Sequence, residues 1–401
     1  MGKSLPDDIF RMKIIALLHD PPHKAFLMSK GRSHEAEAKR LIKGIFGDDL
    51  VKDIVDNRIK NADKVASSFD HWLLSLLMGR KYIPGLFQER RVKLKNIIEP
   101  SLEIPLTNST PREDLIYETD DSYTKVLSNY VNMMHDYVMK YHLFYMLYEL
   151  LWIEKGLPIG PADTRVPTHT IFDHNYATTT MLNWTLATKS SVNGLLVGLD
   201  VALVQEFISS SRKLRDMWAA SYIISALTWY ALIELIAKIG PDTLIMPSLR
   251  ANPFYVYWFK EKLKKMNPDD YSDLIDFIER HIEKLIYLTD EVLNMYRELK
   301  LPPYPILPGR ATIILPPLNL VKELLGNNID DIRQYLIRRF GKGWQLLWKA
   351  IKKYAEKIVK RKKNDLLWQF INEAFEYYAC LLYTSDAADD GESVDLGGRR
   401  I

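Results

Sequence analysis

Hydrophobic positions in the first 190 residues recur at spacings of three and four, which is the period of an amphipathic α-helix. The clearest stretches are 34–46, 50–58, 65–78 and 123–154, and a further helix is expected over 175–186. An apolar run that ends at Leu18 precedes them, and two prolines after it must end the helix that carries it. The range 86–112 has three prolines and predicts an irregular basic connection. The N-terminal part is therefore predicted to be mainly helical.

The pattern changes near residue 190, where short apolar runs bounded by glycine or proline replace the long amphipathic stretches. Three of these runs, 194–200, 242–247 and 311–316, predict buried strands. Helices are expected between them over 203–215, in a long apolar stretch that ends at 239, and over 269–299. This order suits a ferredoxin-like α/β sandwich, although order alone leaves the strand pairing open.

Basic residues dominate the next part of the chain, which is predicted to be helical. Between 349 and 363, eight lysine or arginine residues stand against one glutamate. A solvated helix face is the default interpretation, and contact with a phosphate backbone is the functional one. The stretch 381–401 loses apolar periodicity, and we interpret it as non-native sequence, which would make the chain an N-terminal fragment.

The predicted fold class is therefore α+β and multidomain. Its four parts are 1–190, 191–325, 326–380 and 381–401.

Composition changes this picture only slightly. Of the 401 residues, 47% are hydrophobic and 26% charged, a globular balance, and the net charge of 54 − 51 = +3 does not demand a nucleic-acid partner. The single cysteine, Cys380, excludes a disulfide framework and suits a cytoplasmic setting. No signal peptide is visible, and the uncharged stretch 217–233 is interpreted as a buried core helix.

Candidate chemistry begins with the hexapeptide HDPPHK at 19–24. The doublet His19-Asp20 offers one nitrogen and one oxygen ligand, a set that suits Mn, Fe, Ni or Zn and, less often, Mg. The prolines hold His23 near the doublet, and Lys24 could neutralise charge on a phosphate. Such doublets also occur by chance, and we interpret His135-Asp136 as ordinary helix because no third ligand lies nearby.

Two further segments could complete a metal site. NADKVASS places Asp63 at a helix start, where a carboxylate favoured by the helix dipole is the simpler interpretation. PADTRVPTHTIFDH supplies two histidines and two aspartates, and its His174 could equally be a capping or packed residue. Together with the doublet, these segments form the residue set of an HD-type phosphohydrolase, in which a metal activates water.

Competing catalytic motifs are absent from the sequence. It contains neither a Gly-x-Ser-x-Gly elbow nor a Gly-x-x-x-x-Gly-Lys-Ser/Thr phosphate loop. The tripeptide GDD at 47–49 is expected between helices rather than in a strand hairpin, so it does not indicate a polymerase-type metal site.

Four segments in this order, LLHDPPHKAF, NADKVASS, PADTRVPTHTIFDH and GLLVGLDVALVQEFISSSRKLRDMWAASYIIS, resemble the large subunit of type III-B CRISPR effector complexes, the Cmr-module form of the Cas ten family. The resemblance covers about residues 10–320 and implies a circularly permuted HD nuclease domain followed by the first of two polymerase-palm-like domains. The implied metal ligands are His19, Asp20, Asp63 and His174. The implied catalytic residues are His19, Asp20, His23 and Lys24.

The resemblance also implies a function. The HD domain would cut single-stranded DNA with a divalent metal, Mn, Ni or Co, or alternatively Mg, when target RNA is bound. The partners would be CRISPR RNA, target RNA and other Cmr-module subunits in the cytoplasm, without a membrane. Cyclic oligoadenylate synthesis from ATP is expected only in an intact parent protein, because the Gly-Gly-Asp-Asp motif is absent from this sequence.

Two alternatives stay open beside the nuclease. One is a scaffold and RNA-binding subunit with a vestigial HD site. The other is a free-standing HD phosphohydrolase, which has no need of the palm-like segment. In that segment we expect Phe207 and Ile208 to pack on the sheet, and we leave Arg212 and Lys213 open between packing, a nucleotide pocket and RNA contact.

Overall fold

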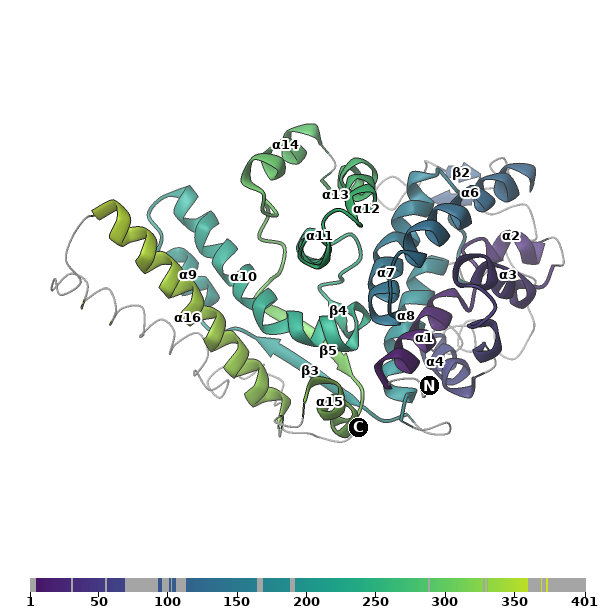
Figure 1. Cartoon of the computed structure of the whole chain (residues 1–401), viewed down its shortest axis with the longest axis horizontal. Helices are drawn as coiled ribbons and strands as arrows, with labels where there is room; N and C mark the ends of the chain where they lie inside the picture. The colour runs from purple at the N-terminus through teal and green to yellow at the C-terminus, as the bar shows by residue number, and fades with distance from the viewer. Residues whose placement is uncertain are drawn as a thin grey trace. The chain divides into compact units, whose positions relative to one another are not determined.

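The computed structural model divides the chain into two compact units (Figure 1). It describes residues 5–29, 32–54, 56–68, 93–95, 101, 103–105, 113–163, 169–187, 192–287, 289–326, 329, 331–359, 369 and 373. The first unit comprises Met1–Gly194 and Tyr255–Leu293, and the second comprises Leu195–Phe254 and Asn294–Ile401. The second unit begins close to the predicted boundary at 191, but the segment 255–293, which we expected in the second domain, packs in the first unit.

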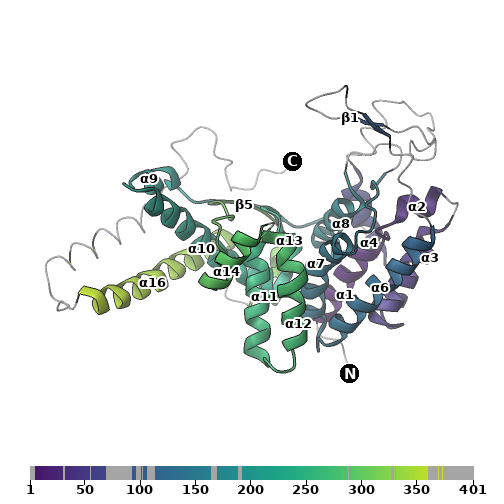
Figure 2. The ribbon, with the colours of Figure 1, turned by 90° about the horizontal axis from the view of Figure 1, so that it is seen from above.

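The first unit is built from helices. Its elements are α1 (Leu5–Leu18), α2 (Lys24–Ser29), α3 (His34–Phe46), a 3-10 turn (Val51–Asp53), α4 (Asn57–Ala66), β1 (Lys93–Lys95), β2 (Glu103–Pro105), α6 (Glu113–Asn132), α7 (Tyr137–Glu154), α8 (Ile171–Thr185), most of α11 (Pro253–Met266), α12 (Ser272–Phe277), a π-helical turn (Ile278–Ile282) and α13 (Glu283–Tyr287), with α14 (Asp290–Leu299) crossing the division. Helices α1, α7 and α8 pack together (Figure 2). Apolar and aromatic residues occur all around α7, as expected for a helix covered on most sides.

Two helix predictions in the first unit are wrong. The predicted helix 123–154 is two helices, because Asp136 caps α7: its Oδ1 accepts a hydrogen bond of 2.7 Å from the Met139 N–H. The doublet His135-Asp136 therefore lies in a turn rather than in a helix. The predicted helix 50–58 is only a 3-10 turn followed by the start of α4, which Asp56 caps in the same way. Most of 65–78 and 86–112, and all of 381–401, lie outside the described residues.

The second unit carries a three-stranded antiparallel sheet. Its elements are β3 (Leu195–Asp200), α9 (Val204–Ser209), α10 (Leu214–Ile239), a 3-10 turn (Pro241–Thr243), β4 (Leu244–Met246), β5 (Arg310–Leu315), α15 (Leu318–Leu325) and α16 (Ile332–Val359). The strand order is β3-β5-β4, and β5 is antiparallel to both neighbours. All three predicted strands are present. The predicted helix 203–215 is instead interrupted at 210–213, between α9 and α10.

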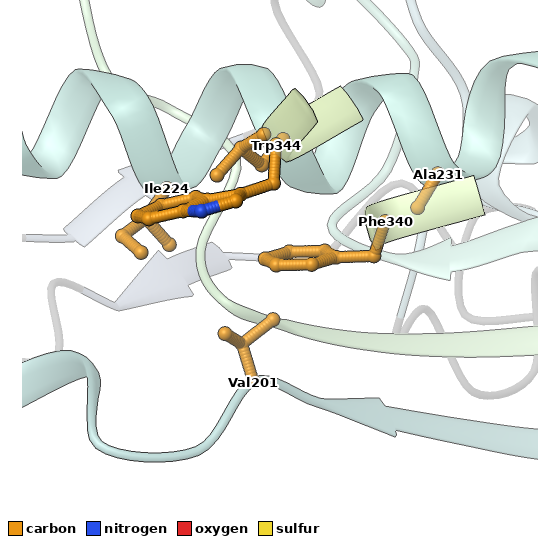
Figure 3. Packing of buried hydrophobic residues seen from close by; sticks show 6 residues of the cluster. Val201, Ile224, Ala231, Phe340 and Trp344 are labelled. Atoms are coloured by element: carbon orange, nitrogen blue, oxygen red, sulfur yellow. The ribbon is translucent and has the colours of Figure 1, made fainter. Parts of the chain in front are cut away.

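The core of the second unit lies between α10 and α16 (Figure 3). Phe340 and Trp344 of α16 pack against Ile224 and Ala231 of α10 and against Val201, which follows β3. By length and apolar composition alone, α10 could cross a membrane, and it is the one helix among the described residues that could. Half of its most apolar stretch is buried inside the protein, which agrees with our interpretation of this stretch as a core helix.

Two glycines on α16 face different surroundings and give a matched test of this packing. A Cβ on Gly343 would lie 2.9 Å from Cδ1 of Tyr230, whereas a Cβ on Gly341 meets nothing within 4 Å. We expect Gly343→Ala to lower the free energy of unfolding by about 1–3 kcal/mol. Gly341→Ala should raise it by about 0.5–1 kcal/mol, because alanine is the better helix former. Denaturant titration of both variants checks this, and two shifts of the same sign would contradict the described packing.

Candidate metal centre

Three segments that are distant in the sequence meet at the C-terminal end of α1. His19 and Asp20 directly follow this helix, Asp63 lies within α4, and His174 lies in the first turn of α8. Helix α4 packs along α8, and α1 contacts both, so the three segments are held by helix packing rather than by a loop.

A capping box fixes the first turn of α8 and with it the position of His174. The Thr170 hydroxyl oxygen accepts a hydrogen bond of 3.1 Å from the Asp173 N–H, and the Asp173 carboxylate accepts one of 2.9 Å from the Thr170 N–H. Thr170 thus caps the helix, and His174 is buried and faces the cluster. The helix begins at Ile171, four residues before the start that we predicted.

The facing atoms of the cluster are two imidazole nitrogens and two carboxylates. His174 Nε2 lies 3.1 Å from Asp63 Oδ1 and 3.3 Å from His19 Nε2. His19 Nε2 lies 3.7 Å from Asp63 Oδ1. Asp20 Oδ2 lies 3.6 Å from His19 Nε2 and 3.7 Å from His174 Nε2. The donor atoms of His19, Asp63 and His174 all lie within 4.8 Å of one another.

These separations suit ligands of a single metal ion. Two donor atoms that are each about 2.1 Å from one ion, at octahedral or tetrahedral angles, lie about 3.0–3.4 Å apart. The observed separations run from 3.1 to 3.7 Å. The Nδ1–H of His19 donates a hydrogen bond of 2.7 Å to the Ala16 carbonyl, which in the neutral ring leaves the Nε2 lone pair directed at the cluster. The residues present therefore fit a divalent cation with mixed nitrogen and oxygen ligands.

The electrostatics of the cluster favour a positive charge between these side chains. Burial alone would lower the pKa of His19, but the carboxylates of Asp20 and Asp63 outweigh it and raise this pKa. Burial would raise the pKa of Asp63, but His174 and His19 hold it well below its usual range. The pKa of Asp20 is likewise lowered, against the effect of burial, by His19 and Lys24. The field that favours a proton here also favours a metal cation.

Buried polar groups hold the backbone and side chain of Asp20 in position. Asn175 is fully buried, and its Nδ2 donates hydrogen bonds to the Asp20 carbonyl at 2.9 Å and to the Tyr148 hydroxyl at 2.7 Å. This arrangement ties the turn after α1 to both α7 and α8. On the other side, His34 Nε2 lies 3.7 Å from Asp20 Oδ1. No sequence pattern indicated Asn175, Tyr148 or His34, although Asn175 directly follows His174 in the motif.

The structure gives two predicted catalytic residues other partners. Lys24 Nζ lies 2.5 Å from Asp20 Oδ2, so its charge is paired with the predicted ligand. His23 is almost fully buried, stacks on Trp152 and places its Nε2 3.3 Å from Glu37 Oε1. The stiff turn therefore directs His23 away from the cluster, and a catalytic role for it stays a prediction.

The pair of Glu37 and His23 predicts an acid dependence of stability. Burial would raise the pKa of Glu37, but the nearby His23 ring and the two hydrogen bonds from the Arg40 guanidinium lower it from 4.5 to about 2. The stabilisation is therefore complete above pH 4.5 and is lost as the pH falls through about 2. Its upper limit is about 3 kcal/mol. We expect the Glu37→Gln variant to show a weaker loss of unfolding free energy over this range, whereas an unchanged profile would contradict the pairing.

The segment before α10 contains one core residue and two exposed cations. Phe207 is half-buried, with its ring centroid 6.2 Å from that of Trp344, so it packs in the core against α16, whereas we had expected it on the sheet. Arg212 and Lys213 are exposed.

Comparisons with known proteins support one family. The family model described as CRISPR-associated protein Cmr2, N-terminal, matches residues 196–360. The chain is 37% identical over 397 residues to the CRISPR system CMR subunit Cmr2 of Saccharolobus solfataricus, an alignment that covers 94% of this chain and 36% of the relative. It is 34% identical over 149 residues to the Cmr2 subunit of Pyrococcus furiosus, which covers 34% of this chain and 16% of that relative.

Solved structures that resemble this chain come from the same family. A chain of the type III-B Cmr-beta complex in its apo state matches with a TM-score of 0.68 and 36% identity, covering 93% of this chain and 36% of that one. A chain of the Cmr-beta complex bound to cognate target RNA matches with a TM-score of 0.65 and 33% identity, covering 93% of this chain and 35% of that one. The chain thus spans about a third of the length of the relatives that it matches along nearly all of its own length.

Proposed function

The chain belongs to the Cmr2 family of type III-B CRISPR large subunits, and from this premise we propose that its first unit is a metal-dependent nuclease for single-stranded DNA. The observation that carries the proposal is the convergence of His19, Asp63 and His174, with Asp20 beside them. These residues come from three separate segments, and all four are the ligands that the sequence resemblance implied.

Each residue has a proposed role. His19, Asp63 and His174 would hold the metal, and Asp20 would either complete the ligand set or orient it. A divalent ion bound there, Mn, Ni, Co or Mg, lowers the pKa of water and polarises a phosphoryl oxygen. Lys24 forms an ion pair with the Asp20 carboxylate, and in the proposed reaction it would also offset negative charge on a bound phosphate. Asn175 fixes the backbone at Asp20.

We also propose a palm-like role for the second unit. Strand order β3-β5-β4, with the middle strand antiparallel to both others, is the order of the first three strands in a ferredoxin-like unit. The solved relatives are parts of Cmr-beta complexes, one of them with target RNA. By analogy we propose CRISPR RNA, target RNA and other Cmr subunits as partners, in the cytoplasm. ATP binding and cyclic oligoadenylate synthesis are proposed only for a longer protein.

Cleavage of labelled single-stranded DNA by the full chain with Mn²⁺ tests the nuclease proposal. Wild type should cleave, and the His19→Ala, Asp20→Ala double variant should not. Equal cleavage by both would place the activity elsewhere or in a contaminant. If neither cleaves, the same comparison is repeated in a complex assembled with guide and target RNA, and failure there would favour a scaffold with a vestigial site.

A further inference from the structure

The outer face of α16 carries more positive charge than its surroundings neutralise. Ile332–Val359 contains eight arginine or lysine residues and one glutamate, so its formal charge is 8 − 1 = +7. Arg339 belongs to the interface with α10, where its Nη1 lies 3.3 Å from Glu234 Oε2 and its guanidinium packs on the Tyr230 ring. Most of the remaining charge lies on the side of the helix that faces away from Phe340 and Trp344.

Five exposed cations form a stripe along that side. They are Arg338, Lys342, Lys349, Lys353 and Lys357. At about 100° per residue the first four fall within an arc of about 60°, with Lys357 beside them, and the stripe is about 28 Å long. Among the side chains that the structure describes, which do not include that of Glu356, no carboxylate forms an ion pair with any of the five. The C-terminal half of α16 extends past α10, and no coloured helix or strand covers it in Figure 2.

The chemistry of this stripe suits an extended polyanion. Like charges along one helix face repel each other, and a chain of phosphates relieves this repulsion at every step. Four of the five residues are lysines, which act as point charges toward phosphates and do not read bases in a fixed geometry. Binding should therefore be independent of sequence and sensitive to salt.

An exposed aromatic ring beside the stripe points to a single strand. The Tyr354 side chain is 68% exposed and lies one turn before Lys357, about 60° further around the helix, so its ring flanks the C-terminal end of the stripe. Aromatic rings among cations provide stacking sites for unpaired bases, which a duplex does not offer. We propose that the outer face of α16 binds the backbone of a single-stranded RNA, with one base stacked on Tyr354. The choice of RNA rests on the proposed role in an RNA-guided complex.

Anisotropy of a labelled single-stranded RNA with the full chain, over a range of salt concentrations, tests this proposal. The variant Lys349→Ala, Lys353→Ala, Lys357→Ala should lose about 100-fold in affinity at about 0.1 M salt. Its slope of log affinity against log salt should fall by about 2, because each phosphate contact on a single strand contributes about 0.7. Alanine favours helix, so α16 should still form, which circular dichroism checks.

A matched variant separates the effect of the stripe on RNA affinity from the effect of the protein's net charge. Lys265→Ala, Lys284→Ala, Arg297→Ala removes the same three charges from exposed positions on other helices, and its affinity should change less than about threefold. Wild-type affinity and salt slope in the stripe variant would overturn the proposal, as would an equal loss in both variants. Neither readout involves DNA cleavage, so a failed nuclease proposal would be seen separately.

Tyr354→Ala tests the choice of a single strand. Its affinity should fall about fivefold for single-stranded RNA and stay unchanged for duplex RNA, because stacking needs an unpaired base. Equal effects on both RNAs, or no effect on either, would overturn the stacking role.

Discussion

His174→Ala is expected to lower Mn²⁺-dependent cleavage of single-stranded DNA at least about 100-fold, although it leaves the His19-Asp20 doublet intact. The imidazole of His174 is the best-placed donor of the cluster, with its Nε2 3.1 Å from Asp63 Oδ1 and 3.3 Å from His19 Nε2. Outer groups that only orient metal ligands already contribute about 10–100-fold, so loss of a direct ligand should cost at least as much. The rate of cleavage and the affinity for Mn²⁺ by calorimetry are both measured.

The chain supplies its own control for this experiment. His135 also precedes an aspartate, but it is exposed in the turn before α7, and none of the described metal-ligand candidates lies with it. His135→Ala should therefore leave cleavage and Mn²⁺ affinity unchanged. If His174→Ala cleaves like wild type while the doublet variant is inactive, His174 is not a ligand. If Mn²⁺ affinity is unchanged but cleavage is lost, His174 acts on DNA rather than on the metal.

Local signals in the sequence were sufficient for several elements. The range 34–46 matches α3, because its apolar spacing is regular and Ser33 caps it. The three strands were found because each is a short apolar run bounded by glycine or proline. The break before α7 was missed, since the apolar period continues across it and only the capping aspartate marks it. The chain also pairs 255–293 with the first unit, which no local pattern indicates.

The sequence predicted correctly which segments form the candidate site, but not which side chains of those segments face it. His19 and His23 stand four residues apart in one motif, yet only His19 faces the cluster. The direction of His23 depends on Trp152, whose ring stacks on it at 5.9 Å, and on Glu37, and neither contact has a sequence signature near 19–24. The contacts of His34 and Asn175 with Asp20 were not predicted for the same reason, because tertiary packing alone brings these residues together.

The second large effect concerns the stability of the first unit. Lys260 and Glu283 are each 98% buried, and Lys260 Nζ lies 2.6 Å from Glu283 Oε1. Glu283→Ala leaves the ammonium group in the interior, so the free energy of unfolding should fall by about 3–5 kcal/mol. A loss near 3 kcal/mol is expected, because Glu279 Oε1 at 2.7 Å still pairs with Lys260 from a more exposed position. Urea titration monitored by circular dichroism measures the change in unfolding free energy.

Two comparisons show whether the buried charge causes this loss. Glu261→Ala breaks the exposed pair with Lys264, which lies on the same helix at 3.1 Å, and should change the unfolding free energy by less than about 0.5 kcal/mol. Lys260→Met with Glu283→Leu removes both buried charges and keeps the volume, so it should recover most of the stability lost in Glu283→Ala. If the double variant is as unstable as Glu283→Ala, the loss comes from packing and not from an unpaired charge. If Glu283→Ala matches the surface control, water or Glu279 already compensates the Lys260 ammonium.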